Sequence, residues 1–260
     1  MFIDTHTHLY AASFDEDRSE MIERAIEAGV EQFYLPNIDL ESIPGMYALE
    51  KMYPNRMFPL MGLHPCSVGA DYKEVLSEIK NQLDQRSFVG VGEIGMDLYW
   101  DQTYKKEQEE AFLMQVEWAE ELNLPIIIHS RETTQLLIDI LRNYGIGRSR
   151  GIFHCFGGTD TEANQIIELG FHLGIGGVLT FKKSTLPTVI KEIDLAHLVL
   201  ETDSPYLAPS PKRGKRNESS FLIHVAQKLA DIKELPLEII AKQTTNNARQ
   251  IFGSSTQLNN

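Results

Sequence analysis

The chain has 260 residues, with 37 acidic and 24 basic side chains and a formal net charge of −13. This length is typical of a single (β/α)8 barrel, and a hydrophobic content of 42% is enough for a large core. Nonspecific coating of nucleic acid needs a basic surface, so the charge argues against that class of protein. An enzyme that takes one nucleic-acid end into a pocket remains compatible with it.

Targeting signals are not evident in the sequence. No run of about 18 or more apolar residues predicts a transmembrane helix, and no basic region followed by an apolar run predicts a signal peptide. The only cysteines, Cys66 and Cys155, do not form a disulfide framework, which favours a reducing cytosol. We interpret both thiols as core or supporting groups rather than as metal ligands.

Apolar runs and helical periodicity alternate along the whole chain. The predicted strands cover residues 1–8, 30–38, 57–64, 88–94, 125–130, 151–156, 171–176 and 197–202. The predicted helices cover residues 14–28, 40–52, 72–83, 104–122, 133–144, 161–169, 184–193, 219–231 and 237–252. Eight such units predict parallel strands in a single (β/α)8 barrel with an extra C-terminal helix. Without an internal repeat or linker, residues 1–260 are expected to form one domain.

Polar residues cluster at the predicted strand ends. His6 and His8 are two residues apart on the first strand, so their side chains project to the same side. The carboxyl ends of other strands add His64, Glu93, Asp97, His129, His154 and Asp203. These ends converge on one face of a barrel, where such folds place their active sites. His172 and His197 lie at the opposite strand ends.

Each of these residues alone also has a structural explanation. A single histidine on a strand is usually a core residue, and Asp203 before Ser204 and Pro205 fits a turn. Together, however, so many imidazoles and carboxylates on one face are difficult to explain without metal.

The donor types favour zinc, manganese or iron, with magnesium less expected because it prefers oxygen ligands. Six candidate ligands exceed the needs of one tetrahedral ion, so we predict two divalent ions that share Glu93. His6, His8 and Asp203 would complete one site, and His129 with His154 the other.

The sequence resembles the TatD family of metal-dependent deoxyribonucleases, which belong to the amidohydrolase-like barrels. The matching motifs occur in order at residues 4–8, 62–65, 92–97, 128–131, 153–156, 200–207, 216–218 and 247–249. The resemblance implies a metal-dependent hydrolase that removes nucleotides from DNA ends. It also implies that His6, His8, Glu93, His129, His154 and Asp203 are metal ligands. Two departures concern the loops: Ser219 and Ser220 follow Glu218 where the family usually has proline, and Gly157 follows the motif at 153–156 where serine is common.

For catalysis we expect an attacking water activated by two metal ions, with Glu93 as the shared ligand and Asp203 as general base or as a pure ligand. Arg131 is a candidate phosphate contact, and His64 and Glu201 are candidates to orient ligands or substrate. Arg216 belongs to a basic cluster at 212–216 that could line the substrate path or lie in solvent.

Two other functions fit the same pattern. A barrel hydrolase of this metal type could act on amide or ester bonds, such as those of a cyclic amide, a lactone or an acylated tRNA. A non-catalytic barrel could bind only metal. The expected partners are DNA ends or a small phosphodiester, with no membrane and no obligate protein partner.

Overall fold

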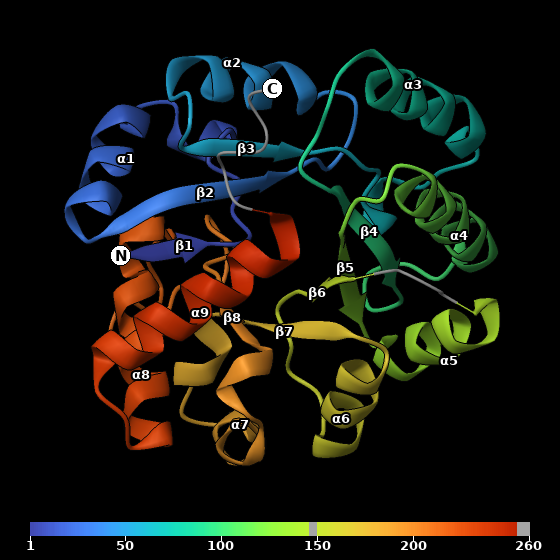
Figure 1. Cartoon of the computed structure of the whole chain (residues 1–260). Helices are drawn as coiled ribbons and strands as arrows, with labels where there is room; N and C mark the ends of the chain where they lie inside the picture. Colours follow the sequence, from blue (N-terminus) through green and yellow to red (C-terminus); the bar gives the residue numbers. More distant parts are fainter. Residues whose placement is uncertain (146–149, 254–260) are drawn as a thin grey trace.

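A computed structural model describes residues 1–145 and 150–253. In these ranges eight parallel strands alternate with helices (Figure 1). The strands are β1 (Phe2–Asp4), β2 (Val30–Pro36), β3 (Met57–Leu60), β4 (Val91–Asp97), β5 (Ile126–Arg131), β6 (Gly151–Phe153), β7 (Phe171–Ile175) and β8 (Leu198–Leu200). The α-helices are α1 (Arg18–Glu27), α2 (Ile43–Met52), α3 (Tyr72–Gln85), α4 (Lys105–Glu121), α5 (Thr134–Tyr144), α6 (Asp160–Glu168), α7 (Leu186–Glu192), α8 (Leu222–Lys233) and α9 (Leu237–Phe252).

The strands form two continuous ladders, β1-β2-β3 and β4-β5-β6-β7-β8. Single parallel bridges join the ladders: Met61 pairs with Val91 between β3 and β4, and Thr7 pairs with Ser204 after β1 and β8. The Thr5 N–H also donates to the Leu200 carbonyl at 3.1 Å. The predicted α/β barrel is therefore confirmed, with α9 as the extra C-terminal helix.

Several strands are shorter than the sequence predicts. The strand predicted over residues 1–8 ends at Asp4, the one over 57–64 ends at Leu60, and the one over 197–202 ends at Leu200. Beyond these points the backbone leaves the regular ladder and makes only isolated bridges. Strand β4 differs in the other direction, because its pairing with β5 continues to Asp97 opposite Arg131. Glu93 therefore lies inside β4 rather than at its end.

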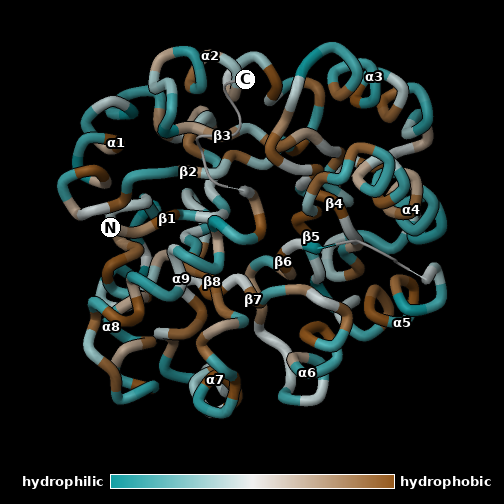
Figure 2. The backbone as a smooth tube through the Cα atoms, viewed as in Figure 1, coloured by the Kyte–Doolittle hydropathy of each residue, from teal (hydrophilic) through white to brown (hydrophobic). Residues whose placement is uncertain are grey.

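The outer helices are amphipathic, and in Figure 2 they alternate between hydrophilic and hydrophobic positions. Their apolar faces cover the strands, as Leu137, Ile138 and Leu141 of α5 show by being fully buried. No helix within the described ranges combines the length and apolar character needed to cross a membrane.

A separate apolar cluster fills the barrel interior on the side of the strand starts. It joins Ile3, Tyr34, Phe58, Leu60, Val89, Ile127, Ile152 and Val199 to Ala248, Ile251 and Phe252 of α9. The rings of Tyr34 and Phe252 stack with centroids 3.9 Å apart. Helix α9 thus closes one end of the barrel (Figure 1), and the opposite end carries the polar residues.

Candidate metal centre

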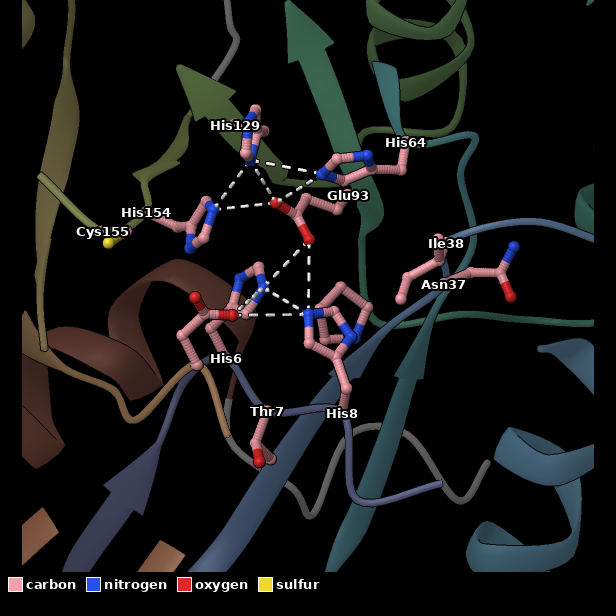
Figure 3. A network of polar contacts seen from close by, with 12 residues as sticks. His6, Thr7, His8, Asn37, Ile38, His64, Glu93, His129, His154 and Cys155 are labelled. Atoms are coloured by element: carbon pink, nitrogen blue, oxygen red, sulfur yellow. Dashed lines mark hydrogen bonds and ion pairs between the residues drawn. The ribbon is translucent and has the colours of Figure 1, made fainter. Parts of the chain in front are cut away.

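Glu93 lies at the centre of the polar end, and its two carboxylate oxygens face two different groups of side chains (Figure 3). Its side chain is only 2% exposed. The position depends on a close approach of β4 to β5, because a Cβ added at Gly95 would lie 2.0 Å from the His129 carbonyl oxygen. Gly95 also has a φ of +142°, which side-chain-bearing residues rarely adopt.

The first donor group comprises His6, His8 and Asp203. The Nε2 atoms of His6 and His8 lie 3.2 Å apart, and they lie 3.1 and 3.5 Å from Glu93 Oε2. Asp203 Oδ1 is 3.5 Å from His8 Nε2 and 3.8 Å from His6 Nε2. Asp203 has a φ of 55°, a left-handed conformation that aspartate tolerates better than most residues. Its N–H donates to the His6 carbonyl at 2.9 Å, which joins the loops after β8 and β1.

The second donor group comprises His129, His154 and His64, and it surrounds Glu93 Oε1. His129 Nδ1 and His154 Nε2 each lie 2.8 Å from this oxygen. His64 Nε2 lies 3.4 Å from the same oxygen and 3.3 Å from His129 Nδ1. The structure therefore adds His64, from the loop after β3, to the two histidines that the sequence assigned to this group.

Both donor groups have the composition of a site for a divalent transition metal. Imidazole nitrogens and carboxylate oxygens converge without a lysine or arginine among them. Ligands about 2.0–2.2 Å from a tetrahedral ion are separated by about 3.3–3.6 Å. The spacings of 3.1 to 3.8 Å in the first group are close to that range. The donor groups therefore fit metal ions, and the shared Glu93 fits a pair of them.

The buried charges in this site strongly influence one another. Burial would raise the pKa of Glu93, but His154 and His6 outweigh it and hold that pKa well below its usual range. Burial also opposes protonation of His154, yet Glu93 and Glu201 raise its pKa well above the ordinary value. In contrast, burial and His154 lower the pKa of His6. A cation bound here would compete with protons for His154.

Asp97 and Tyr10 each contact one histidine of the donor groups through the ring nitrogen that faces away from the other donors. Asp97 Oδ2 lies 2.9 Å from His129 Nε2, so the imidazole is held between Asp97 and Glu93. The Tyr10 hydroxyl lies 2.8 Å from His8 Nδ1 and donates to the Pro36 carbonyl. Such contacts fix the ring orientation of metal-binding histidines. Sequence reasoning missed Tyr10, although its spacing of two residues from His8 was a possible signal.

Glu201 supports the site but does not line it. Its side chain is fully buried, Oε1 accepts the Cys155 N–H at 2.5 Å, and the same oxygen lies 3.5 Å from His154 Nδ1. The carboxylate fits there because Gly174 has no side chain, since a Cβ would lie 2.2 Å from Glu201 Oε2. Glu201 is therefore placed to orient His154, and it is not among the residues that line the cavity.

Ser219, one of the two departures from the TatD pattern, has a defined contact. Its hydroxyl donates to Asp4 Oδ2 at 2.6 Å, and the Thr202 hydroxyl donates to the same oxygen at 2.6 Å. Asp4 is completely buried, and burial raises its pKa to about 7. Proline could not make this bond, so Ser219 links the chain before α8 to the ends of β1 and β8.

A cavity of about 830 Å³ opens above the two donor groups. Arg131, the candidate phosphate contact, lines this cavity, and so do His64 and both cysteines. The cysteines are unpaired. Gly157, the other departure from the pattern, also lies in this wall.

The basic cluster at residues 212–216 is arranged differently from the prediction. Arg216 donates to Asp17 Oδ2 at 2.8 Å and to the Ser13 carbonyl at 2.6 Å, and its guanidinium lies over Phe14. Arg213 lies over the ring of Phe181. These contacts do not support a role of Arg216 in substrate binding. Its guanidinium is paired with Asp17, the residue before α1, and Arg216 is not among the residues that line the cavity.

A family model described as TatD related DNase matches residues 3–253. The chain belongs to this family. It is similar to the uncharacterized metal-dependent hydrolase YabD of Bacillus subtilis (strain 168), with 39% identity over 97% of this chain and 99% of that protein. It is also similar to the 3'-5' ssDNA/RNA exonuclease TatD of Pantoea ananatis, with 29% identity over 96% of this chain and 98% of that one.

Among solved structures, the chain is similar to YJJV, a TatD homologue from Escherichia coli K12. The TM-score is 0.91, with 30% sequence identity and coverage of 97% of this chain and 98% of that one. The resemblance inferred from the motifs and the expected fold are thus both confirmed.

Proposed function

We propose that this chain is a divalent-metal-dependent phosphodiesterase that removes nucleotides from DNA ends. Family membership supports a hydrolase acting on phosphodiester bonds. The observation that carries the proposal is the placement of Glu93 between two donor groups, with one carboxylate oxygen toward each. The name of the relative from Pantoea ananatis supports attack from the 3' end of a single strand.

His6, His8 and Asp203 would hold one ion with Glu93 Oε2. His129 and His154 would hold the second with Glu93 Oε1, and His64 lies close enough to assist. Ions bound there would acidify a water molecule and neutralise charge on the phosphoryl oxygens. Five imidazoles lie within 3.5 Å of Glu93 Oε1 or Oε2, which favours zinc or manganese over magnesium.

The protein itself supplies a base and a phosphate contact in this proposal. Asp203 is 13% exposed, more than any other carboxylate of the donor groups, and can accept the proton of an attacking water. Arg131 faces the cavity with its guanidinium stacked 4.1 Å above Tyr99, which presents its N–H groups to a phosphate in a fixed orientation.

The decisive experiment combines metal analysis with digestion of end-labelled single- and double-stranded DNA. We expect about two equivalents of zinc or manganese per chain and shortening of the labelled strand. Removal of metal by a chelator should stop the reaction, and added metal should restore it. Failure of the metal-loaded protein to cleave any phosphodiester would contradict the proposal.

The same preparation tests the two other functions. If a lactone, cyclic amide or acylated tRNA is hydrolysed while DNA remains intact, the barrel acts on ester or amide bonds. If metal binds but no substrate class is turned over, the barrel only binds metal.

We also propose that residues 1–260 act as one domain in the cytosol, without an obligate protein partner. Two unpaired cysteines support a reducing compartment. Gel filtration and fractionation of cells would test both points.

A further inference from the structure

Exposed aromatic rings border the cavity on two opposite walls. Trp100, in the loop after β4, is 72% exposed, and Tyr206, after β8, is 54% exposed. Strands β4 and β8 are four positions apart in a ring of eight, so these residues face each other across the mouth. Large aromatic side chains at a cavity rim are costly to leave in water, which points to a ligand that covers them.

The backbone of Trp100 is tied to the residues of the second donor group. Asp97 Oδ1 accepts the backbone N–H of Tyr99 at 3.0 Å and that of Trp100 at 3.3 Å. The other oxygen of Asp97 contacts His129 Nε2. The Arg131 guanidinium lies 5.8 Å from the Trp100 ring centroid. One carboxylate therefore ties the aromatic loop to the second donor group.

The side chains that line the cavity offer little electrostatic attraction for the phosphate backbone of a nucleic acid. Glu93, Asp97 and Asp203 line the cavity, and Arg131 is the one arginine or lysine among its described lining residues. The whole chain carries a net charge of −13. Affinity for a nucleotide must then come from the metal ions and from the base, rather than from a basic groove.

We infer that Trp100 is the stacking platform for an unpaired nucleobase at the strand end, with Tyr206 on the opposite side. The inference rests on the proposed function, because it assumes that a nucleotide enters this cavity. An unpaired base can turn one face onto Trp100 while its phosphate approaches the donor groups, whereas a paired base is held by its partner and its neighbours in the duplex. Trp100 would therefore make the site selective for single-stranded ends and for nucleotides that retain their base.

The test uses metal-loaded protein and two ligands without a phosphodiester bond, thymidine 5'-monophosphate and 2-deoxyribose 5-phosphate. The chain has two tryptophans, and Trp118 is only 8% exposed, so Trp118→Phe leaves Trp100 as a fluorescent reporter. We expect the mononucleotide to quench this fluorescence and to bind about 5- to 150-fold more tightly than the sugar phosphate. Calorimetry on the parent protein provides the same ratio if Trp118→Phe lowers stability.

Trp100→Ala should abolish the difference between the two ligands, whereas Trp100→Phe should retain most of it. The matched control is Tyr144→Ala, another exposed aromatic residue, at the end of α5 outside the cavity wall. It should leave both affinities unchanged. In cleavage assays, Trp100→Ala should raise KM for single strands and reduce the preference over blunt duplex.

Equal binding of the two ligands to the parent protein, or an unchanged ratio in Trp100→Ala, would overturn the inference. These outcomes are separate from failure of the proposed function. Cleavage of DNA with no base dependence would leave the phosphodiesterase intact and remove the Trp100 platform. Base-dependent binding without cleavage would support the Trp100 platform and contradict the proposed phosphodiesterase.

Discussion

The two ends of this barrel are built from the same strands but have opposite chemistry. At the strand starts, Tyr34, Phe58 and Phe252 stack in a closed apolar cluster under α9. At the strand ends, carboxylates and imidazoles converge beneath an open cavity of about 830 Å³. The closed end gains free energy from burial, whereas the open end concentrates groups that are costly to bury unless an ion or a counter-charge compensates them.

This contrast separates stability from activity within one fold. Substitutions at the closed end should reduce the free energy of unfolding and leave the chemistry of the folded molecules intact. Substitutions among the donor groups at the open end should reduce activity and leave the free energy of unfolding nearly unchanged. Four variants test that separation.

The largest effect is expected for Glu93→Gln, which removes the charge shared by both donor groups. We expect a loss of at least about a thousandfold in kcat/KM together with reduced bound metal. The melting temperature should change little, which circular dichroism can check. Glu238→Gln makes the same change on an exposed residue of α9 and should be silent. Retention of both metals and activity in Glu93→Gln would contradict the two-ion site.

Phe252→Ala should have the largest effect on stability. It removes a ring that is 5% exposed and stacked on Tyr34, and comparable truncations cost about 3–5 kcal/mol. Urea denaturation measures the loss, and kcat/KM per folded molecule should match the parent. Trp100→Ala, at the other end, should leave the urea midpoint nearly unchanged. A catalytic defect in folded Phe252→Ala would show that the two ends are coupled.

Asn247→Ala tests a residue of the last motif that resembles the TatD pattern. Asn247 is fully buried, and its Nδ2 donates to the carbonyls of Leu195 and Leu198 at 2.8 and 2.7 Å. Its loss should cost about 1–3 kcal/mol of stability, because the buried Leu198 carbonyl and the partly buried Leu195 carbonyl both lose a donor. Asn246→Ala is the matched control, since that neighbour is exposed. A loss of activity without a loss of stability would assign the motif to function instead.

The smallest effect is expected for Asp17→Asn, at the rim of the open end. Hydrogen bonds from Arg216 and Arg24 lower the pKa of Asp17 to about 2 from its ordinary value of 3.8. Because the folded-state pKa is depressed, the stabilisation is present above about pH 4 and is lost as the pH falls toward 2. An exposed pair is worth less than about 1 kcal/mol. When the pH is lowered from 5 to 3, the urea midpoint of Asp17→Asn should therefore fall less than that of the parent protein. Equal decreases in the two proteins would refute the stabilising role of ionised Asp17.

Part of the site followed directly from local sequence rules. Alternation along a strand predicted that His6 and His8 project together, and their Nε2 atoms do lie 3.2 Å apart. Barrel topology predicted that Glu93, His129, His154 and Asp203 would join them, which the structure also shows. These rules depend only on strand periodicity and on the shared direction of parallel strands.

Loop residues were harder to predict, because their side chains point wherever the packing of neighbouring segments directs them. His64 was treated as a supporting group, yet it lies beside Glu93 in the second donor group. Glu201 and Arg216 were candidates for substrate contact, yet one is buried behind His154 and the other pairs with Asp17. Nothing in the spacing of these residues distinguishes such outcomes.

The sequence by itself determined the alternation of strands and helices, the family, and the six polar residues that meet at one end of the barrel. Those features follow from periodicity and strand direction, which are local properties of the chain. Only the tertiary structure decided which Glu93 oxygen faces which histidines, how α9 closes the opposite end, and where Trp100 lies at the cavity mouth. These depend on contacts between segments far apart in the chain, where close packing rather than pattern selects the arrangement.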